Sequence, residues 1–417
     1  MSETNVTEIK TLNGYPLADT KAREDIAALS EENKQCYVLS DMPLYLGKQH
    51  GKNNPYIPVE ILDFDGFGLC ASYGAKKEMY SLDPASLTLT KLCDMVYGTE
   101  ENPNWYCAKI MPTWGTQDKD KVLLWDRKTQ AVYLGVTSGM VTNRFQSQKL
   151  GWLRNQGIDI SVNANGYTSG TMIYAEYYLP DFGVDVDTVK VYRSTDLGQT
   201  WTAVFEQKCR HNAAGGEVFH FHFVRQDPYN PGHWYLGSGD QKEECNMWRS
   251  VDDGLTWTKI NDPNFTGNLQ PIHRTCDLYF TEDYIYWGTD DHMEYLEGFK
   301  DAVWCKSPRN LDTNQLSIEV LADLEDQVRL TIQTPYGVLL ATEKKTHNNS
   351  WVWLAPYDDL DHPVLVCKHH ESFGNQVQQH SYGSRFFSAS QHTDDYPRTN
   401  TDAWLHVHDI SRMSRLD

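Results

Sequence analysis

Acidic and amide side chains recur at one place in four similar segments of the chain. Each segment ends with a small residue, one spacer and the acid or amide, as in Ser238-Gly239-Asp240. The four final residues are Asp240, Asp290, Glu343 and Gln391. Apolar and β-branched residues precede them, as is typical of strands. In a repeating β fold these side chains converge at one mouth, where like carboxylates are costly unless they meet cations or ligand hydroxyls.

Complementary polar side chains stand in the segments that lead into the next innermost strand. They are Arg210, His211, His220, His222, His273, Arg274, Gln327, Arg329 and His392. The alternation of residues 218–223 predicts that His220 and His222 lie on one side of a strand and three phenylalanines on the other. Carboxylates, imidazoles and guanidinium groups beside aromatic rings suit the hydroxyls and flat faces of sugars. We therefore expect these residues, with Glu343 and Gln391, to bind a carbohydrate.

An enzyme is the alternative use of the same mouth. A glycoside hydrolase needs two carboxyl groups, whose separation decides whether configuration is retained or inverted. Asp240 and Asp290, on adjacent repeats, are the catalytic pair we predict for that case. A polysaccharide lyase would need a base and a charge-neutralising cation. No compact ligand spacing supports a metal site, so we expect neither a metal nor another cofactor.

A repeated motif indicates the fold. Residues 191–202 align with residues 247–258, and both contain Ser-x-Asp-x-Gly-x-Thr-Trp. In such a turn the Asp accepts bonds from backbone amides, the Gly permits a positive φ and the Trp packs the next strand. The motif resembles the Asp box, or BNR repeat, of sialidase-like β-propellers. The resemblance implies a structural role, in turns far from the active site, for Ser194, Asp196, Gly198, Trp201, Ser250, Asp252, Gly254 and Trp257.

The resemblance implies the fold and not sialidase activity, because the chain has no Arg-Ile-Pro motif. Some propeller lyases that act on oligogalacturonates hold a metal through several histidines and a glutamine. His220, His222, His273 and Gln327 have the residue types of such a site, although their spacing gives no support.

Short strand-like runs separated by Gly, Asp, Asn and Pro turns fill the chain from residue 36. Grouped around the two motifs, they predict an all-β, seven-bladed β-propeller over residues 36–417, with six blades as the alternative. The last blade lacks an outer strand, which Cys36–Ser40 could supply. This closure joins the two ends of the chain and leaves no bare sheet edge.

Residues 1–35 differ from the rest and are expected to form a separate arm. The segment 21–34 predicts a short helix, which is marginal alone and so is expected to pack on something, including copies of itself. Leu12–Arg23 resembles the N-terminal segment of tail and fibre proteins from phages and prophages of Gram-positive gut bacteria. The resemblance implies an anchor to other tail proteins and a homo-oligomer, with a trimer favoured.

Composition limits the partners and the cellular setting. The formal net charge of −20 disfavours nucleic acid, and no apolar run approaches the ~20 residues of a membrane span. The polar N-terminus does not resemble a signal peptide. Nine scattered cysteines indicate reduced thiols in a protein made in a reducing cytoplasm.

We therefore expect a carbohydrate-binding propeller that serves as a phage or phage-like tail receptor-binding protein, in a virion tail, on bacterial surface glycan. A glycan-degrading enzyme and a protein-interaction propeller are the second and third hypotheses. Whether the protein is an enzyme stays open at this point.

Overall fold

The computed structural model describes most of the chain from residue 155 and isolated strands before it. The described residues are 11–12, 15–16, 36–37, 40–44, 59–64, 68–72, 78–83, 88–94, 105–110, 121–126, 131–136, 145–149, 155–162, 168–178, 186–196, 198–210, 215–310, 314–324, 326–342, 350–369, 385–391, 403–409 and 415–416. The helix predicted over residues 21–34 lies outside them.

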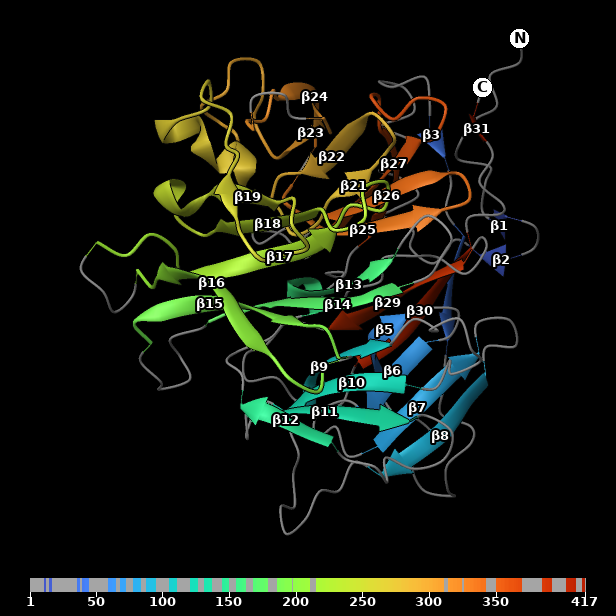
Figure 1. The fold of residues 1–417 in the computed structure, drawn as a ribbon. Helices are drawn as coiled ribbons and strands as arrows, with labels where there is room; N and C mark the ends of the chain where they lie inside the picture. The colour runs from blue at the N-terminus through green and yellow to red at the C-terminus, as the bar shows by residue number, and fades with distance from the viewer. Residues whose placement is uncertain are drawn as a thin grey trace. The chain divides into compact units, whose positions relative to one another are not determined.

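Four-stranded sheets dominate the described part of the chain, where six of them occur (Figure 1). In each sheet, strands consecutive in the sequence are neighbours. The first two sheets contain β5 (Val59–Phe64), β6 (Gly68–Ser72), β7 (Glu78–Asp83) and β8 (Thr88–Asp94), then β9 (Trp105–Ile110), β10 (Lys121–Asp126), β11 (Ala131–Val136) and β12 (Phe145–Lys149). This repetition of four-stranded meanders makes the fold an all-β propeller.

The next sheets carry the candidate site. The third contains β13 (Ile158–Val162), β14 (Thr168–Ala175), β15 (Thr188–Ser194) and β16 (Thr202–Lys208). The fourth contains β17 (His220–Gln226), β18 (Trp234–Gly239), β19 (Asn246–Ser250) and β20 (Thr258–Lys259). The fifth contains β21 (Tyr279–Phe280), β22 (Tyr284–Gly288), β23 (Val303–Pro308) and β24 (Glu319–Asp323). Short 3₁₀ helices are η3 (Asn155–Gly157), η5 (Lys242–Glu244) and η6 (Gly267–His273).

The sixth four-stranded sheet contains β25 (Val328–Thr334), β26 (Gly337–Thr342), β27 (Ser350–Pro356) and β28 (Val364–His369). A three-stranded sheet contains β29 (Arg385–Gln391), β30 (Ala403–Asp409) and β4 (Ser40–Leu44). Two strand pairs complete the described set: β1 (Thr11–Leu12) with β2 (Tyr15–Pro16), and β3 (Cys36–Tyr37) with β31 (Arg415–Leu416).

The outer strand of the three-stranded sheet begins where the predicted closing strand ends. The prediction placed it at Cys36–Ser40, whereas β4 begins at Ser40 and pairs with β30. Cys36 and Tyr37 instead form β3, which pairs with β31. Segments near both ends of the chain therefore share ladders of backbone hydrogen bonds.

A one-residue bulge recurs between the first and second strands of four sheets. The pairing shifts between Ile61 and Asp63, Trp105 and Cys107, Phe221 and Phe223, and Val328 and Leu330. The extra residues are therefore Leu62, Tyr106, His222 and Arg329. A bulge bends a strand and redirects a side chain, so this position is suited to presenting a polar group.

The bulge at His222 also changes which core is entered by each of the phenylalanines of residues 218–223. Phe219 and Phe221 pack with the cluster formed by the third and fourth sheets, whereas Phe223 packs with the cluster of the fourth and fifth. The predicted placement of all three phenylalanines on one side of the strand is therefore wrong. Strict alternation fails because His222 takes the extra position.

The chain divides into two compact units, one of residues 1–74, 82–89 and 325–417 and the other of residues 75–81 and 90–324. The residues of the candidate site discussed below all belong to the second unit. Among the helices that the structure describes, none has the length and apolarity of a membrane span.

Candidate functional site

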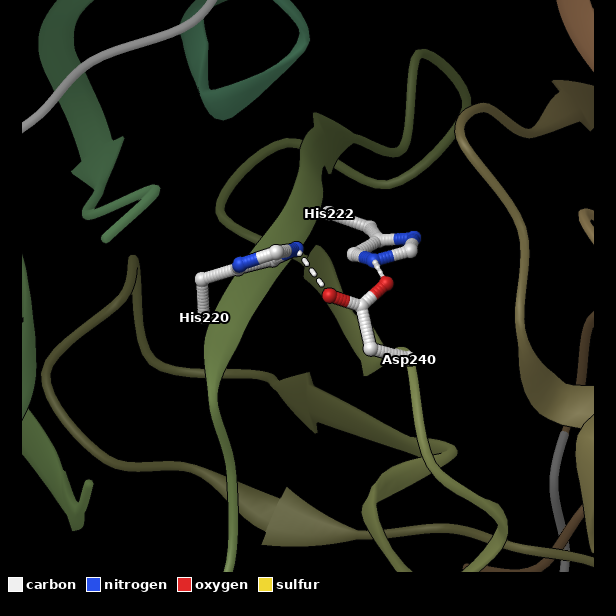
Figure 2. Close-up of side chains that lie close together, drawn as sticks. All are labelled: His220, His222 and Asp240. Carbon is white, nitrogen blue, oxygen red and sulfur yellow. Dashed lines mark ion pairs between the residues drawn. The ribbon is translucent and has the colours of Figure 1, made fainter. Parts of the chain in front are cut away.

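Two histidines and an aspartate meet where β17 begins and β18 ends (Figure 2). Nε2 of His220 lies 3.3 Å from Oδ2 of Asp240, and Nε2 of His222 lies 3.4 Å from Oδ1 of the same carboxylate. The pairing of His220 with Gly239 places Asp240 one residue beyond the ladder, next to both rings. Both imidazoles are buried, and their rings stack at a centroid distance of 5.0 Å.

Asp240 is held in an uncommon backbone conformation. Its φ is +103°, in a region that favours glycine, and its side chain remains 30% exposed. Burial would by itself raise the pKa of this carboxyl. Contact with His222 and the charges of His220, His222 and Arg274 outweigh burial, so its pKa lies far below its usual range. A strained residue with a strongly perturbed carboxyl is the combination expected at a functional site.

Arg274 joins three carboxylates in this cluster. Its NH2 lies 3.0 Å from Oδ1 of Asp240, its Nε 3.4 Å from Oδ2 of Asp290, and its NH1 3.4 Å from Oδ2 of Asp291. Gly239 makes room for the arginine, because a Cβ there would lie 2.6 Å from Cγ of Arg274. We call His220, His222, Asp240, Arg274, Asp290 and Asp291 the His–Asp cluster.

Asp290 lies beneath the cluster rather than at its surface. Its side chain is 0% exposed, its Oδ2 lies 3.6 Å from Nδ1 of His222, and the Cys276 thiol is 3.5 Å from the same oxygen. Its backbone N–H donates to the carbonyl of Arg274. A fully buried carboxylate cannot contact a sugar directly, so the predicted catalytic pair of Asp240 and Asp290 does not form an accessible hydrolase site.

Two tyrosines beside the His–Asp cluster, and Asp291 within it, are residues that the sequence analysis did not indicate. Tyr177 stacks on His220 at a centroid distance of 3.8 Å, and the carbonyl of Tyr178 accepts a 2.9 Å bond from Nδ1 of His220. The doublet Asp290-Asp291 is a signal that points to Asp291. The tyrosines follow β14 and reach the cluster through the packing of neighbouring sheets, which no local pattern reveals.

His273 is not part of the cluster, which corrects the sequence prediction. Its Nδ1 bonds the carbonyl of Gln270, and its Nε2 accepts from the backbone N–H of Asp262. Burial lowers its pKa to about 4. Both ring nitrogens thus serve the local backbone of η6, so neither is available to a metal or a sugar.

Arg210 lines a separate cavity of about 1020 Å³. Its walls combine aromatic rings with polar groups: Phe205, Gln207, Glu217, Glu243, Asn246, Trp248, Trp257 and Lys259, with Gly215 and Gly216. NH1 of Arg210 lies 3.3 Å from Glu243 and 3.1 Å from Glu244, and its side chain is 41% exposed. We call this space, between β16 and the strands β19 and β20, the aromatic cavity.

Glu244 interacts with the aromatic cavity through Arg210 and with the His–Asp cluster through the charge of Asp240. Its side chain is 1% exposed, and Oε1 contacts Arg210. Burial, aided by the charge of Asp240 and opposed by Arg210, raises its pKa to about 7. Asp240 and Glu244 therefore have pKa values shifted in opposite directions.

The other predicted ligands that the structure describes belong to the first unit, and the rest lie outside the described residues. Arg329 occupies the bulge of β25, and its NH2 lies 3.4 Å from Oε1 of Gln327. Gln391 ends β29 and is described by its backbone alone. His211, Glu343 and His392 lie outside the described residues.

The two repeated motifs form matching turns between the third and fourth strands of their sheets. Asp196 accepts from N of Thr200 at 2.8 Å and from its hydroxyl at 2.6 Å, and Trp201 bonds the carbonyl of Gly198. The second turn repeats these bonds. Its counterparts are Asp252, Thr256, Trp257 and Gly254, and both glycines have φ near +80°, at +78° and +82°.

No family model and no curated protein matches the chain. Among solved structures, the chain is similar to the β-propeller domain of Myceliophteria thermophila Cps50 (Swd1), with a TM-score of 0.47 and 10% identity over 85% of this chain and 96% of that one. It is similar to Saccharomyces cerevisiae Sqt1, with a TM-score of 0.44 and 7% identity over 83% and 85% of the two chains. It is also similar to an ancestral GH74 enzyme, with a TM-score of 0.46 and 11% identity over 75% of this chain and 38% of that one.

Proposed function

We propose that this protein is a carbohydrate-binding propeller and that the aromatic cavity holds the sugar. The cavity supports the proposal because it joins the rings of Phe205, Trp248 and Trp257 to charged groups within one space of about 1020 Å³. Aromatic rings pack on the apolar faces of sugars, while guanidinium and carboxylate groups pair with their hydroxyls.

Arg210 is the principal polar contact in this proposal. Its guanidinium is held by Glu243 and Glu244 on one nitrogen, which limits its movement, while 41% of its side chain stays exposed. Glu217 is exposed and also lines the cavity, where it supplies a carboxylate. A donor and an acceptor fixed beside aromatic rings match the paired hydroxyls of a neutral or mixed glycan.

Binding of the purified chain to a panel of bacterial surface glycans tests the proposal. We expect Arg210→Gln and Glu217→Gln each to weaken binding about tenfold or more, which corresponds to the loss of one charge-assisted hydrogen bond. Lys300→Gln changes an exposed cation outside the cavity and should leave binding unchanged. A panel without any binder, or equal effects of all three variants, would move the assignment to a protein-interaction propeller.

Glycan degradation is the second candidate function, and Asp240 is the carboxylate that supports it. Its side chain is 30% exposed, whereas the side chains of Asp290 and Glu244 are 0% and 1% exposed. Incubation with the bound polysaccharide, followed by assays for reducing ends and for unsaturated products, separates the two functions. Depolymerisation that Asp240→Asn abolishes would replace pure binding by catalysis.

We also propose that the protein acts in a phage or phage-like tail and binds glycan on a bacterial surface. The resemblance of Leu12–Arg23 to N-terminal segments of tail and fibre proteins supports this setting. The arm 1–35 would attach the propeller to other tail proteins and join copies of the chain, with a trimer favoured. Light scattering on the full-length chain should give three times the mass of one chain, and a monomer would contradict this part of the proposal.

A further inference from the structure

We propose that His220, His222 and Asp240 bind a divalent first-row transition-metal ion. The three side chains converge from two neighbouring strands, β17 and the end of β18 (Figure 2). Their candidate ligand atoms all lie within 4.8 Å of one another. The site does not depend on the aromatic cavity or on any glycan.

The spacing of the ligand atoms fits a metal better than it fits hydrogen bonds. Metal bonds of about 2.1 Å at tetrahedral or octahedral angles place neighbouring ligand atoms roughly 3.0–3.4 Å apart. The observed separations between histidine Nε2 atoms and the Asp240 oxygens are 3.3 and 3.4 Å. Among the described residues, neither nitrogen of His222 has a partner at hydrogen-bonding geometry.

The proton on His220 is assigned by its outer contact. The carbonyl of Tyr178 can only accept, so Nδ1 of His220 carries the proton of their 2.9 Å bond. In the neutral ring, the lone pair of Nε2 then faces a carboxylate oxygen of Asp240. A metal ion bound between these two atoms satisfies both acceptors.

Each histidine faces an acceptor on its far side, and such acceptors orient metal-binding imidazoles. Nδ1 of His220 bonds the carbonyl of Tyr178, while Nδ1 of His222 faces the buried carboxylate of Asp290 at 3.6 Å, an ion-pair distance and not a hydrogen bond. Arg274 positions Asp290 in turn, through its Nε at 3.4 Å. The second ring nitrogen of each histidine is thereby directed at Asp240.

Charge supports a dication. Asp240, Asp290 and Asp291 place three carboxyl groups around the guanidinium of Arg274, so acids outnumber the arginine at this site. Imidazole nitrogen favours Zn²⁺, Mn²⁺, Fe²⁺ or Co²⁺ over the hard cation Ca²⁺. With three protein ligands the ion keeps open positions, and the 30% exposed side of Asp240 gives them access.

Titration of the metal-stripped full-length chain with Zn²⁺, and with Co²⁺ followed by visible absorption, tests the proposal. We expect one ion per chain, with affinity on the order of 100-fold lower in Asp240→Asn and His222→Gln, at the upper end of the 10–100-fold effect of outer partners. His362→Gln is the matched control. Its Nδ1 lies 2.7 Å from Asp359, but the ring is 77% exposed, so binding should not change.

Three results would overturn the proposal. One is the absence of stoichiometric metal binding by a chain that circular dichroism shows to be folded. In that case His220 and Asp240 would form an ion pair without a metal. Another is equal affinity in Asp240→Asn and the wild-type chain. The third is loss of binding in Cys276→Ser together with a thiolate charge-transfer band, which would move the ion to His222, Cys276 and Asp290. Asp240→Asn and His222→Gln test the site at residues of different burial, so misfolding of one leaves the other informative.

Discussion

Asp240 shows how one residue can combine backbone strain with charge. A non-glycine residue at φ +103° costs on the order of 1–3 kcal/mol, which the surroundings must offset. The offset comes from Arg274 at 3.0 Å and from the two imidazoles. With this backbone conformation, the carboxylate of Asp240 lies against His220 and His222 just beyond the end of β18.

The repeated aspartates Asp196 and Asp252 should contribute to stability and not to ligand binding. Each accepts two bonds from a threonine and one from a serine hydroxyl. We expect Asp196→Ala or Asp252→Ala to lower the free energy of unfolding by about 1–3 kcal/mol, because backbone and hydroxyl donors lose their acceptor. Urea unfolding measures the loss, and in Asp196→Ala the glycan and metal affinities should stay at wild-type values.

The control for this prediction is Glu297→Ala, an exposed acid whose removal should change stability by less than about 0.5 kcal/mol. A loss of affinity in Asp196→Ala without a loss of stability would show that the turn belongs to a binding site.

His273 should make stability depend on pH. Its folded pKa is about 4, below the ordinary value of 6.5, so the unfolded chain binds a proton first as pH falls. The stabilisation is therefore complete above pH 6.5 and is lost progressively between pH 6.5 and 4. At pH 5 the loss relative to pH 7 is about 2 kcal/mol by this linkage.

His273→Gln removes the titrating group, so the stability of this variant should vary less between pH 7 and pH 5. Unfolding in urea at the two pH values gives the comparison, with exposed His362→Gln as the control. Equal pH dependence in His273→Gln and the wild-type chain would show that His273 titrates normally in the folded protein.

At the scale of elements, local sequence patterns predict the strands well. They do not predict the bulges, because bulges depend on how two strands pair. Turn residues and β-branched runs are local, so the short strands predicted from residue 36 onward appear as the strands of the described sheets. The bulge at His222 depends on how β17 pairs with β18, which one strand's sequence does not specify. It turns Phe223 away from the core that contains Phe221.

The same distinction explains the site predictions. His220, His222, Asp240 and Arg274 meet because equivalent strand ends converge, which the repeat pattern already indicates. His273 stands one residue before Arg274, but it belongs to η6, where its ring serves the backbone. Arg210 enters the aromatic cavity because of packing between sheets. Sequence position alone does not separate these cases.

Buried ion pairs between strands should contribute strongly to the free energy of unfolding of the second unit. Asp227, at the end of β17, is 0% exposed and lies 3.1 Å from NH1 of Arg309, which follows β23. We expect Arg309→Ala to lower the free energy of unfolding by about 3–5 kcal/mol, because the aspartate remains as an uncompensated buried charge. Chemical denaturation measures the change.

Lys242→Ala is the control for that prediction, because its ammonium bonds Asn268 at the surface and its loss should cost about 1 kcal/mol or less. A similar small effect of Arg309→Ala would mean that water or a proton compensates Asp227.

For the whole molecule, part of the net charge of −20 comes from acids that are grouped at two places. Three of the 57 acids stand around Arg274 in the His–Asp cluster, and Glu217, Glu243 and Glu244 belong to or adjoin the aromatic cavity. Such a surface repels polyanions and attracts cations. A bound metal ion and a neutral or mixed glycan are therefore compatible ligands for one chain.

The pairing between segments near the two ends of the chain should be important for stability. β30 is the central strand of its sheet: Val407 pairs with Phe387 of β29 on one side and with Met42 of β4 on the other. Proline at this position lacks the backbone N–H and disrupts the ladder. We expect Val407→Pro to lower the free energy of unfolding on the order of 3 kcal/mol and to promote aggregation through the exposed edges of β4 and β29.

Val204→Pro is the matched control, since the same substitution falls on the edge strand β16 at a position that the pairing with β15 skips. Edge strands and bulges tolerate proline, so its effect on the unfolding midpoint in urea should be clearly smaller. Equal losses in the two variants would show that proline acts through local strain. A large loss confined to Val407→Pro, with aggregation on size-exclusion chromatography, would show that the ladder joining the N-terminal and C-terminal segments holds the folded chain together.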